Sequence, residues 1–112
     1  MKLLVVDIGT SGVRAAVVTP EDGVVHSHHR EVLPSSPAPG LVEFDASVMA
    51  EAVLAVATQA AAAAGSVDAV GIANQRASTV VWDRATGQPV GPGLGWQDLR
   101  TVVDCLILAG EG

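Results

Sequence analysis

Three apolar runs open the chain, and each has the length of a β-strand. They span Leu3–Ile8, Val13–Thr19 and Gly23–Val32, and they are rich in valine, isoleucine and leucine. Pro20-Glu21-Asp22-Gly23 has the composition of a turn between the second and third runs. We therefore expect three successive antiparallel strands joined by tight turns.

The periodicity changes after the third run. Prolines 34, 37 and 39 exclude a helix or a central strand from the loop that follows. An alanine-rich segment comes next, with Asp45 as its expected N-cap and Gly65 as its terminator. Phe44 and Met49 are spaced as a hydrophobic staple. We predict a helix from Asp45 to about Ala64 that packs closely against a sheet.

Val67–Ala73 is a short apolar run bounded by turn-forming residues, which predicts a buried strand. A strand that follows a helix implies a crossover connection and parallel pairing, so the expected fold class is α/β. Farther on, Ser78–Asp83 and Gln88–Val90 flank a hairpin turn. Trp96 opens a last, helical segment that is expected to end near Ala109.

Composition narrows the function classes. The 112 residues suffice for one small domain, and the formal net charge of −6 argues against nucleic-acid binding, which needs clustered Lys and Arg. The single cysteine, Cys105, has apolar neighbours and is expected to be a buried structural thiol. A lone cysteine is compatible with a reducing cytosol.

The helix predicted over residues 46–64 is long enough to raise the question of a membrane span. Glu51, Gln59 and the weak hydrophobicity of alanine favour a soluble helix instead. The apolar run after Lys2 ends at Asp7, and no targeting segment is evident. We expect a cytoplasmic protein without a membrane partner.

The turn between the first two strands carries the first candidate chemistry. Asp7 closes a strand, and Gly9 and Gly12 bracket the hydroxyl residues Thr10 and Ser11. A carboxylate beside small residues and free backbone N–H groups suits a metal-bound phosphate, and predicts ATP chemistry. The order strand–turn–strand is neither a P-loop nor a dinucleotide fingerprint. The alternative is an ordinary hairpin turn, which uses the same residue types.

Polar residues gather at a second strand end. Asn74, Gln75 and Arg76 follow the run predicted to be a parallel strand, and ligands of α/β sheets bind outside such carboxyl ends. Three multivalent polar groups there suit a hydroxylated ligand. His26, His28 and His29 on the third strand are either solvent-facing side chains or metal ligands.

Five segments together resemble, in order, the amino-terminal part of the FGGY carbohydrate kinases, with the glycerol-kinase-like branch nearest. The segments are Asp7-Ile8-Gly9-Thr10-Ser11, Gly40-Leu41-Val42-Glu43-Phe44-Asp45, Gly71-Ile72-Ala73-Asn74-Gln75-Arg76, Val81-Trp82-Asp83-Arg84-Ala85-Thr86-Gly87 and Trp96-Gln97-Asp98-Leu99-Arg100-Thr101. The resemblance extends almost from the start of the chain to about Thr101. It implies an actin-like ATPase architecture with a ribonuclease-H-like core in each of two lobes, and ATP and Mg²⁺ between them. Residues 1–112 would be the amino-terminal part of the first lobe, with the second lobe absent.

The resemblance implies ATP-dependent phosphorylation of a hydroxyl on a polyol or sugar. Asp7 would orient the magnesium ion and its waters, and Gly9, Thr10 and Ser11 would face the ATP phosphates. Arg14 would contact the nucleotide and act in catalysis on the transferring phosphoryl group, a chemistry that needs charge neutralisation and positioning. The alternative for Arg14 is a surface charge on a strand.

The same resemblance places Gln75 and Arg76 at the acceptor-alcohol site. Trp96 would offer an apolar wall to the substrate, or else belong to the core, and Asp98 would help order the site. Trp82 would pack against the hairpin or lie on its surface.

The chain departs from the family pattern at three points. Ala77 stands where glycerol-kinase-like sequences carry an acidic residue, which puts glycerol in doubt as the substrate. The catalytic-base aspartate and the adenine-binding lobe of the family lie beyond this sequence, so we expect the isolated chain to be inactive. Exposed apolar faces and a bare sheet edge would favour self-association or a homo-oligomer.

Two other function classes stay open at this point. A non-catalytic binding or regulatory module could have kept the lobe without its chemistry. A chaperone-like or actin-like ATPase lobe is the third, disfavoured by Gln75-Arg76 and Trp96-Gln97-Asp98.

Overall fold

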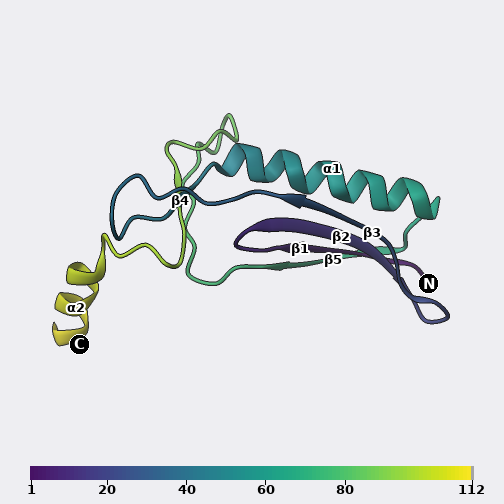
Figure 1. Ribbon diagram of the computed structural model, residues 1–112, viewed down its shortest axis with the longest axis horizontal. Helices are drawn as coiled ribbons and strands as arrows, with labels where there is room; N and C mark the ends of the chain where they lie inside the picture. Colours follow the sequence, from purple (N-terminus) through teal and green to yellow (C-terminus); the bar gives the residue numbers. More distant parts are fainter. Residues whose placement is uncertain (112) are drawn as a thin grey trace.

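A four-stranded sheet with one long helix on one face forms the body of the protein. The computed structural model describes residues 1–111. Sheet order is β3-β2-β1-β5, with β5 parallel to β1 and the other pairs antiparallel. The elements of this body are β1 (Leu3–Ile8), β2 (Gly12–Thr19), β3 (Gly23–Glu31), α1 (Ala46–Ala64) and β5 (Ala69–Asn74) (Figure 1). The three early strands and the returning parallel strand are confirmed.

A smaller layer lies at the amino-terminal end of α1. Strand β4 (Glu43–Phe44) pairs there with β6 (Gly93–Leu94), and the second helix, α2 (Val102–Glu111), follows. The predicted hairpin is present, because the Asp83 amide donates to the Gln88 carbonyl and the Val90 amide to the Val81 carbonyl.

The core lies between α1 and the covered face of the sheet. Alternate residues of β1 and β2 point toward the helix, as the period of a strand requires. On the helix, the buried positions recur at helical spacing, and alanines among them let α1 approach the sheet closely. The buried apolar residues of this core include Leu4, Val6, Val13, Ala15, Val17, Met49, Ala52, Val56 and Ala60.

Both ends of α1 are capped as the sequence predicts. Asp45 Oδ1 accepts hydrogen bonds from the amides of Ser47 (2.9 Å) and Val48 (3.1 Å). Gly65 adopts a φ of 82°, which glycine tolerates, and its amide donates to the carbonyls of Ala61 and Ala62. These local contacts fix where the helix begins and ends.

A β-bulge interrupts the pairing of β2 with β3. The register shifts between Ala15 and Val17, and His26 takes up a positive φ of 52°. His28 then pairs with Ala15 on the covered face, whereas His29 pairs with Arg14 on the open face. Within residues 1–111 no group of three or more His, Cys, Asp or Glu side chains could hold a metal ion. The metal alternative for the three histidines therefore finds no support.

The prediction that residues 67–73 form a buried strand is wrong in part. The strand is β5, and every residue in it is exposed, with Val70 and Ile72 at 57% and 69%. Helix α1 packs over β1, β2 and β3, so its footprint stops short of this edge strand. The apolar run correctly predicts a strand, but it does not predict whether another element covers that strand.

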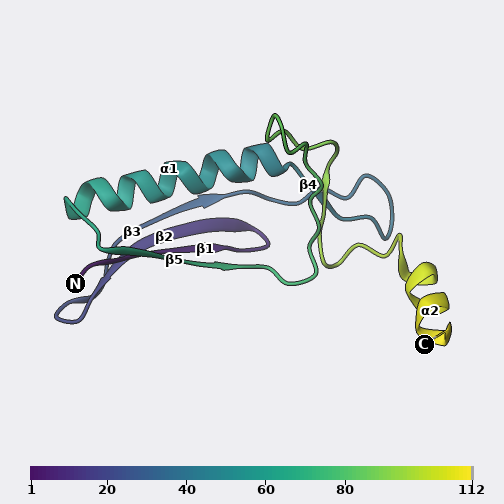
Figure 2. The same cartoon turned by 180° about the vertical axis from the view of Figure 1, so that it is seen from behind.

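The last helical segment also differs from expectation. Helix α2 begins at Val102 rather than at Trp96, and none of its residues 102–111 is buried. Cys105 is exposed, so the prediction of a buried thiol is wrong. Figures 1 and 2 both show α2 beyond the end of the sheet, which explains why its apolar side chains find no core.

Among the described residues, α1 is the one helix long and apolar enough to cross a membrane by length and composition alone. A core helix passes the same test, and Met49, Ala52, Val56 and Ala60 of α1 are buried against the sheet.

Val17 provides a direct test of this core because it is fully buried in β2. Val17→Ala should lower the free energy of unfolding by roughly 2–3 kcal/mol, from lost burial and the remaining cavity. Val24→Ala on β3 is the matched control: Val24 is 68% exposed, and its loss should change stability by about 0.5 kcal/mol or less. Urea titration of both variants measures the difference, and equal losses would contradict this description of the core.

Candidate functional site

The carboxyl ends of β1 and β5 lie side by side. Their parallel register pairs Asp7 with Ala73 and Ile8 with Asn74. The turn after β1 and the polar residues after β5 therefore meet at one edge of the sheet. This is the position where ligands of α/β proteins bind.

Charged side chains form a row on the open face of the sheet at this edge. Asp7 is exposed and pairs across the strands with Arg14, which in turn pairs with His29. Arg14 Nη1 lies 3.5 Å from Ser27 Oγ. A carboxylate, a guanidinium and an imidazole thus face solvent together, beside the turn of residues 9–12.

The turn presents two free backbone donors. The Gly9 amide is occupied, because it donates to the Gly12 carbonyl at 2.9 Å. The amides of Thr10 and Ser11 have no acceptor within residues 1–111. A Cβ on Gly12 would lie 2.7 Å from both the Arg30 carbonyl and His29 Nε2, so glycine is required there. Of the predicted phosphate contacts, Thr10 and Ser11 keep their amides for a ligand.

A ring of hydrogen bonds joins this turn to the residues after β5. Gln75 Nε2 donates to the Gly9 carbonyl (2.8 Å), and Ser78 Oγ donates to Gln75 Oε1 (2.9 Å). The Trp96 amide donates to Ser78 Oγ (3.2 Å), and Trp96 Nε1 donates to Thr10 Oγ1 (3.2 Å). We call these five residues the coupling ring. Sequence reasoning missed Ser78, for which the only signal is a hydroxyl three residues after Gln75.

The two tryptophans and Arg76 lie at the surface. Trp96 is 55% exposed and touches the turn through its indole nitrogen, so the alternative of a core residue is wrong. Trp82 is 61% exposed on the hairpin. Arg76 is also exposed, immediately after the strand end. Trp96 and Arg76 are therefore accessible to a ligand at this edge.

The carboxylate of Asp98 is occupied by hydrogen bonds from other residues of the protein. Its side chain is only 4% exposed, and Oδ2 accepts from the Val42 amide and from Arg100 Nη2, both at 2.7 Å. Arg100 also donates to Oδ1 and to Glu43 Oε1. The hydrogen bonds from the Arg100 side chain hold the pKa of Asp98 well below its usual range. Asp98 therefore orders the segment after Trp96 and is a poor proton acceptor.

Asp83 is likewise engaged by its own turn. Its Oδ1 accepts from the Thr86 and Ala85 amides, and these bonds lower the pKa of the Asp83 carboxyl. A general base needs a pKa near the working pH. Neither aspartate has the environment of a catalytic base.

Ala77 has a left-handed backbone, with a φ of 59°. This conformation costs a residue with a Cβ roughly 1–2 kcal/mol. The strained position lies between Arg76 and Ser78, so the backbone there turns sharply inside the candidate site.

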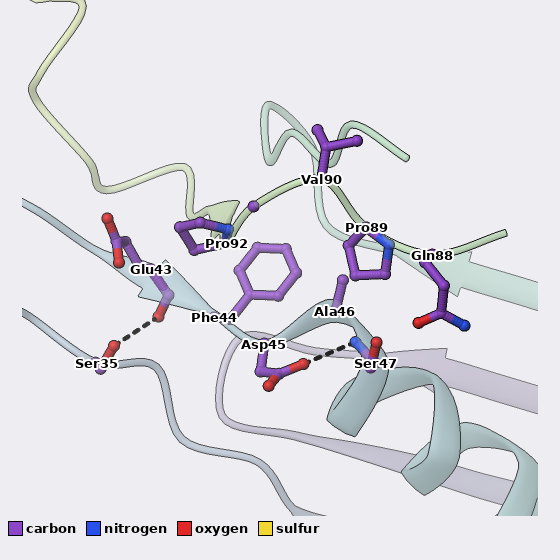
Figure 3. Close-up of a pocket in the computed structure, with 11 residues that line it drawn as sticks. Ser35, Glu43, Phe44, Asp45, Ala46, Ser47, Gln88, Pro89, Val90 and Pro92 are labelled. Atoms are coloured by element: carbon purple, nitrogen blue, oxygen red, sulfur yellow. Dashed lines mark hydrogen bonds between the residues drawn. The ribbon is translucent and has the colours of Figure 1, made fainter. Parts of the chain in front are cut away.

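A pocket of about 550 Å³ lies elsewhere, between the amino-terminal end of α1 and residues 88–92 (Figure 3). None of the predicted site residues lines it. Asp45 already accepts hydrogen bonds from the amides at this helix end. Two of the amides at this helix end are therefore already bound to a carboxylate of the protein itself.

The sequence of residues 2–112 matches the family described as the FGGY family of carbohydrate kinases, N-terminal domain. The chain belongs to this family. It is 40% identical to the glycerol kinase of Coxiella burnetii over 113 residues, covering 97% of this chain and 23% of that protein. It is 39% identical to the glycerol kinase of Gloeobacter violaceus, covering 98% of this chain and 22% of that protein. The chain thus spans under a quarter of the length of these relatives.

Solved structures show the same fold. A glycerol kinase from Plasmodium falciparum with ADP superposes with a TM-score of 0.88 at 23% identity, covering 99% of this chain and 23% of that one. A xylulose kinase from Rhodospirillum rubrum gives 0.85 at 25% identity, covering 100% and 24%. The fold is the predicted ribonuclease-H-like, actin-like ATPase fold, here as part of a first lobe.

The ion pair of Asp98 should make stability depend on pH. Because the folded pKa is lowered, the carboxylate stabilises the protein above the unfolded value of 3.8 and loses this effect as pH falls below it. We expect the melting temperature of the wild type to drop more steeply below about pH 4 than that of Asp98→Asn.

Thermal melts across this acid range measure the two slopes. Asp104→Asn on the exposed helix α2 is the matched control and should keep the steep wild-type slope. Parallel curves for Asp98→Asn and the wild type would show that the carboxylate contributes nothing.

Proposed function

We propose that the protein is an ATP-dependent carbohydrate kinase that phosphorylates a hydroxyl of a polyol or sugar, and that residues 1–112 are the amino-terminal part of its first lobe. One observation carries this proposal. The turn with free amides and the exposed Trp96 are in direct contact, since Trp96 Nε1 lies 3.2 Å from Thr10 Oγ1. A phosphate donor on the turn and an alcohol beside Trp96 would therefore be neighbours.

The residues of the turn suit a magnesium nucleotide. Mg²⁺ keeps several waters and needs only one or two carboxylates besides the phosphates. Asp7 is an exposed carboxylate at the end of β1 and fits this demand. The metal would supply charge neutralisation for phosphoryl transfer, the amides of Thr10 and Ser11 would bind phosphate oxygens, and Arg14 would stabilise the transferring group.

The acceptor alcohol would bind at Arg76 and Trp96. Arg76 offers guanidinium donors to hydroxyls, and the exposed Trp96 ring offers an apolar surface to the carbon skeleton. Gln75 holds the turn through one amide hydrogen and keeps a second for a substrate hydroxyl. Asp98 would act on this site indirectly, by fixing the segment that carries Trp96.

The proton of the alcohol would go to an aspartate outside this sequence. Asp83 and Asp98 are unsuited to accept it, because hydrogen bonds from the protein occupy both carboxylates and lower their pKa values. We therefore infer that residues 1–112 do not turn over alone. We place the protein in the cytoplasm, with a small-molecule substrate and neither nucleic acid nor membrane as partner. The exposed edge strand β5 supports self-association of the isolated chain.

The competing function is a non-catalytic binding module. It would be favoured if the native polypeptide in its source cells ended at Gly112. A native chain several times longer favours the kinase, as does the length of the curated relatives. An ATPase lobe without a sugar site would bind nucleotide and respond to no polyol.

Asp7→Asn in the full-length protein tests the catalytic proposal. Loss of the metal-orienting carboxylate should reduce kcat about 100-fold or more, since metal stabilisation of the transition state is worth several kcal/mol. Glu21→Gln, in the exposed turn at the other end of the sheet, is the control and should leave kcat unchanged. Coupled measurement of ADP release against a polyol and sugar panel gives both values. Full activity of Asp7→Asn would rule out the assigned role.

Ala77→Glu tests the choice of acceptor. The added carboxylate could accept hydrogen bonds from substrate hydroxyls, so kcat/KM for glycerol should rise about tenfold or more relative to the wild type. Ala77→Gln, which has the same size without the charge, should give a smaller gain. If neither variant gains glycerol activity, Ala77 does not determine the specificity.

A further inference from the structure

The coupling ring ties the nucleotide turn to the acceptor wall through hydrogen bonds of side chains and backbone groups. Gly9 and Thr10 are consecutive in the turn, so the four hydrogen bonds through Gln75, Ser78 and Trp96 close a continuous circuit. Ser78 is the central member, because its hydroxyl is shared between Gln75 and Trp96. It lies three residues from Gln75 and eighteen from Trp96, and it is half-buried.

The donors in the ring have a fixed direction. An indole N–H can only donate, so Thr10 Oγ1 must be the acceptor of the Trp96 bond. The single hydroxyl proton of Thr10 is then left over for an acceptor outside the ring. A phosphate oxygen on the turn is such an acceptor.

Hydrogen bonds in a chain polarise one another. A hydroxyl that donates to a phosphate becomes a better acceptor, so a bound nucleotide would strengthen the bond from Trp96 to Thr10. Trp96 is 55% exposed and not held by a core. Its ring is therefore positioned by the bond to Thr10 at its tip and by the bond to Ser78 at its backbone.

We propose that Ser78 is a positioning residue that couples nucleotide binding to acceptor binding through Trp96. The inference rests on the proposed kinase function and extends it. Nucleotide on the turn fixes the Trp96 wall and so raises affinity for the acceptor alcohol. By linkage, the acceptor raises affinity for nucleotide by the same factor.

The first experiment measures this coupling in the full-length protein by calorimetry. The probe is the polyol or sugar that the wild type phosphorylates best, titrated with and without saturating Mg·ADP. The wild type should bind this acceptor at least about fivefold more tightly with ADP present. Ser78→Ala should reduce the gain to within twofold, whereas Ser78→Thr keeps the hydroxyl and should preserve it.

Two further variants sharpen the result. Ser36→Ala is the matched control, since its hydroxyl bonds only to the Ala38 carbonyl in the loop before β4, and the coupling should be unchanged. Trp96→Phe keeps an apolar wall but removes the indole N–H. It should lose the coupling while Ser78 is intact, which keeps the proposal testable if Ser78→Ala folds poorly.

A second readout does not depend on activity. In protein labelled with ¹⁵N-tryptophan, the indole signal absent from Trp96→Phe belongs to Trp96. Mg·ADP should shift this signal in the wild type and in Ser78→Thr, and shift it far less in Ser78→Ala.

A wild type that binds ADP and shifts the signal but phosphorylates no acceptor would refute the kinase proposal and leave the ring supported. An unchanged shift and unchanged coupling in Ser78→Ala would overturn the role of Ser78.

Discussion

The parallel pairing of β1 with β5 is the constraint on which the candidate site depends. It is fixed at its start by contacts between Lys2 and Asp68, where each amide bonds to the other residue, and by the Lys2 ammonium on the Ala64 carbonyl. Six residues later the same register brings Ile8 opposite Asn74. A slip of one residue would turn every side chain of β5 to the other face and separate Gln75 from Gly9.

The parts of the fold that local chemistry decides could be predicted from the sequence. The caps of α1 follow from Asp45 and Gly65, whose preferences act within a few residues. The hairpin turns follow from proline, glycine and aspartate at their positions. The parallel strand follows from the helix that precedes it. Each of these signals is complete within a short window of the chain.

The parts that failed depend on contacts between distant segments. The apolar run of β5 and the thiol of Cys105 on α2 are predicted to be buried, yet burial requires a partner surface that no local pattern names. Its place at a strand end indicates Gln75 as a polar group of the site, and the family resemblance implies Asp98. Neither signal could reveal that Gln75 bonds to a turn 66 residues away or that Asp98 bonds to Val42. How many hydrogen-bonding groups of a polar side chain remain available to a ligand therefore depends on tertiary contacts.

The position of Trp96 shows how such tertiary contacts can replace packing. The residue lies in a segment without regular structure, and its ring is largely exposed. Just before it, the Gly95 amide bonds to the Val42 carbonyl at 2.9 Å, and just after it Asp98 accepts from the Val42 amide. Both hydrogen bonds connect the segment to Val42, the residue before β4. The bonds to Ser78 and Thr10 connect Trp96 to the segments that follow β5 and β1. Polar anchors on two sides restrict the positions open to this exposed tryptophan, and such preorganisation lowers the cost of binding a ligand.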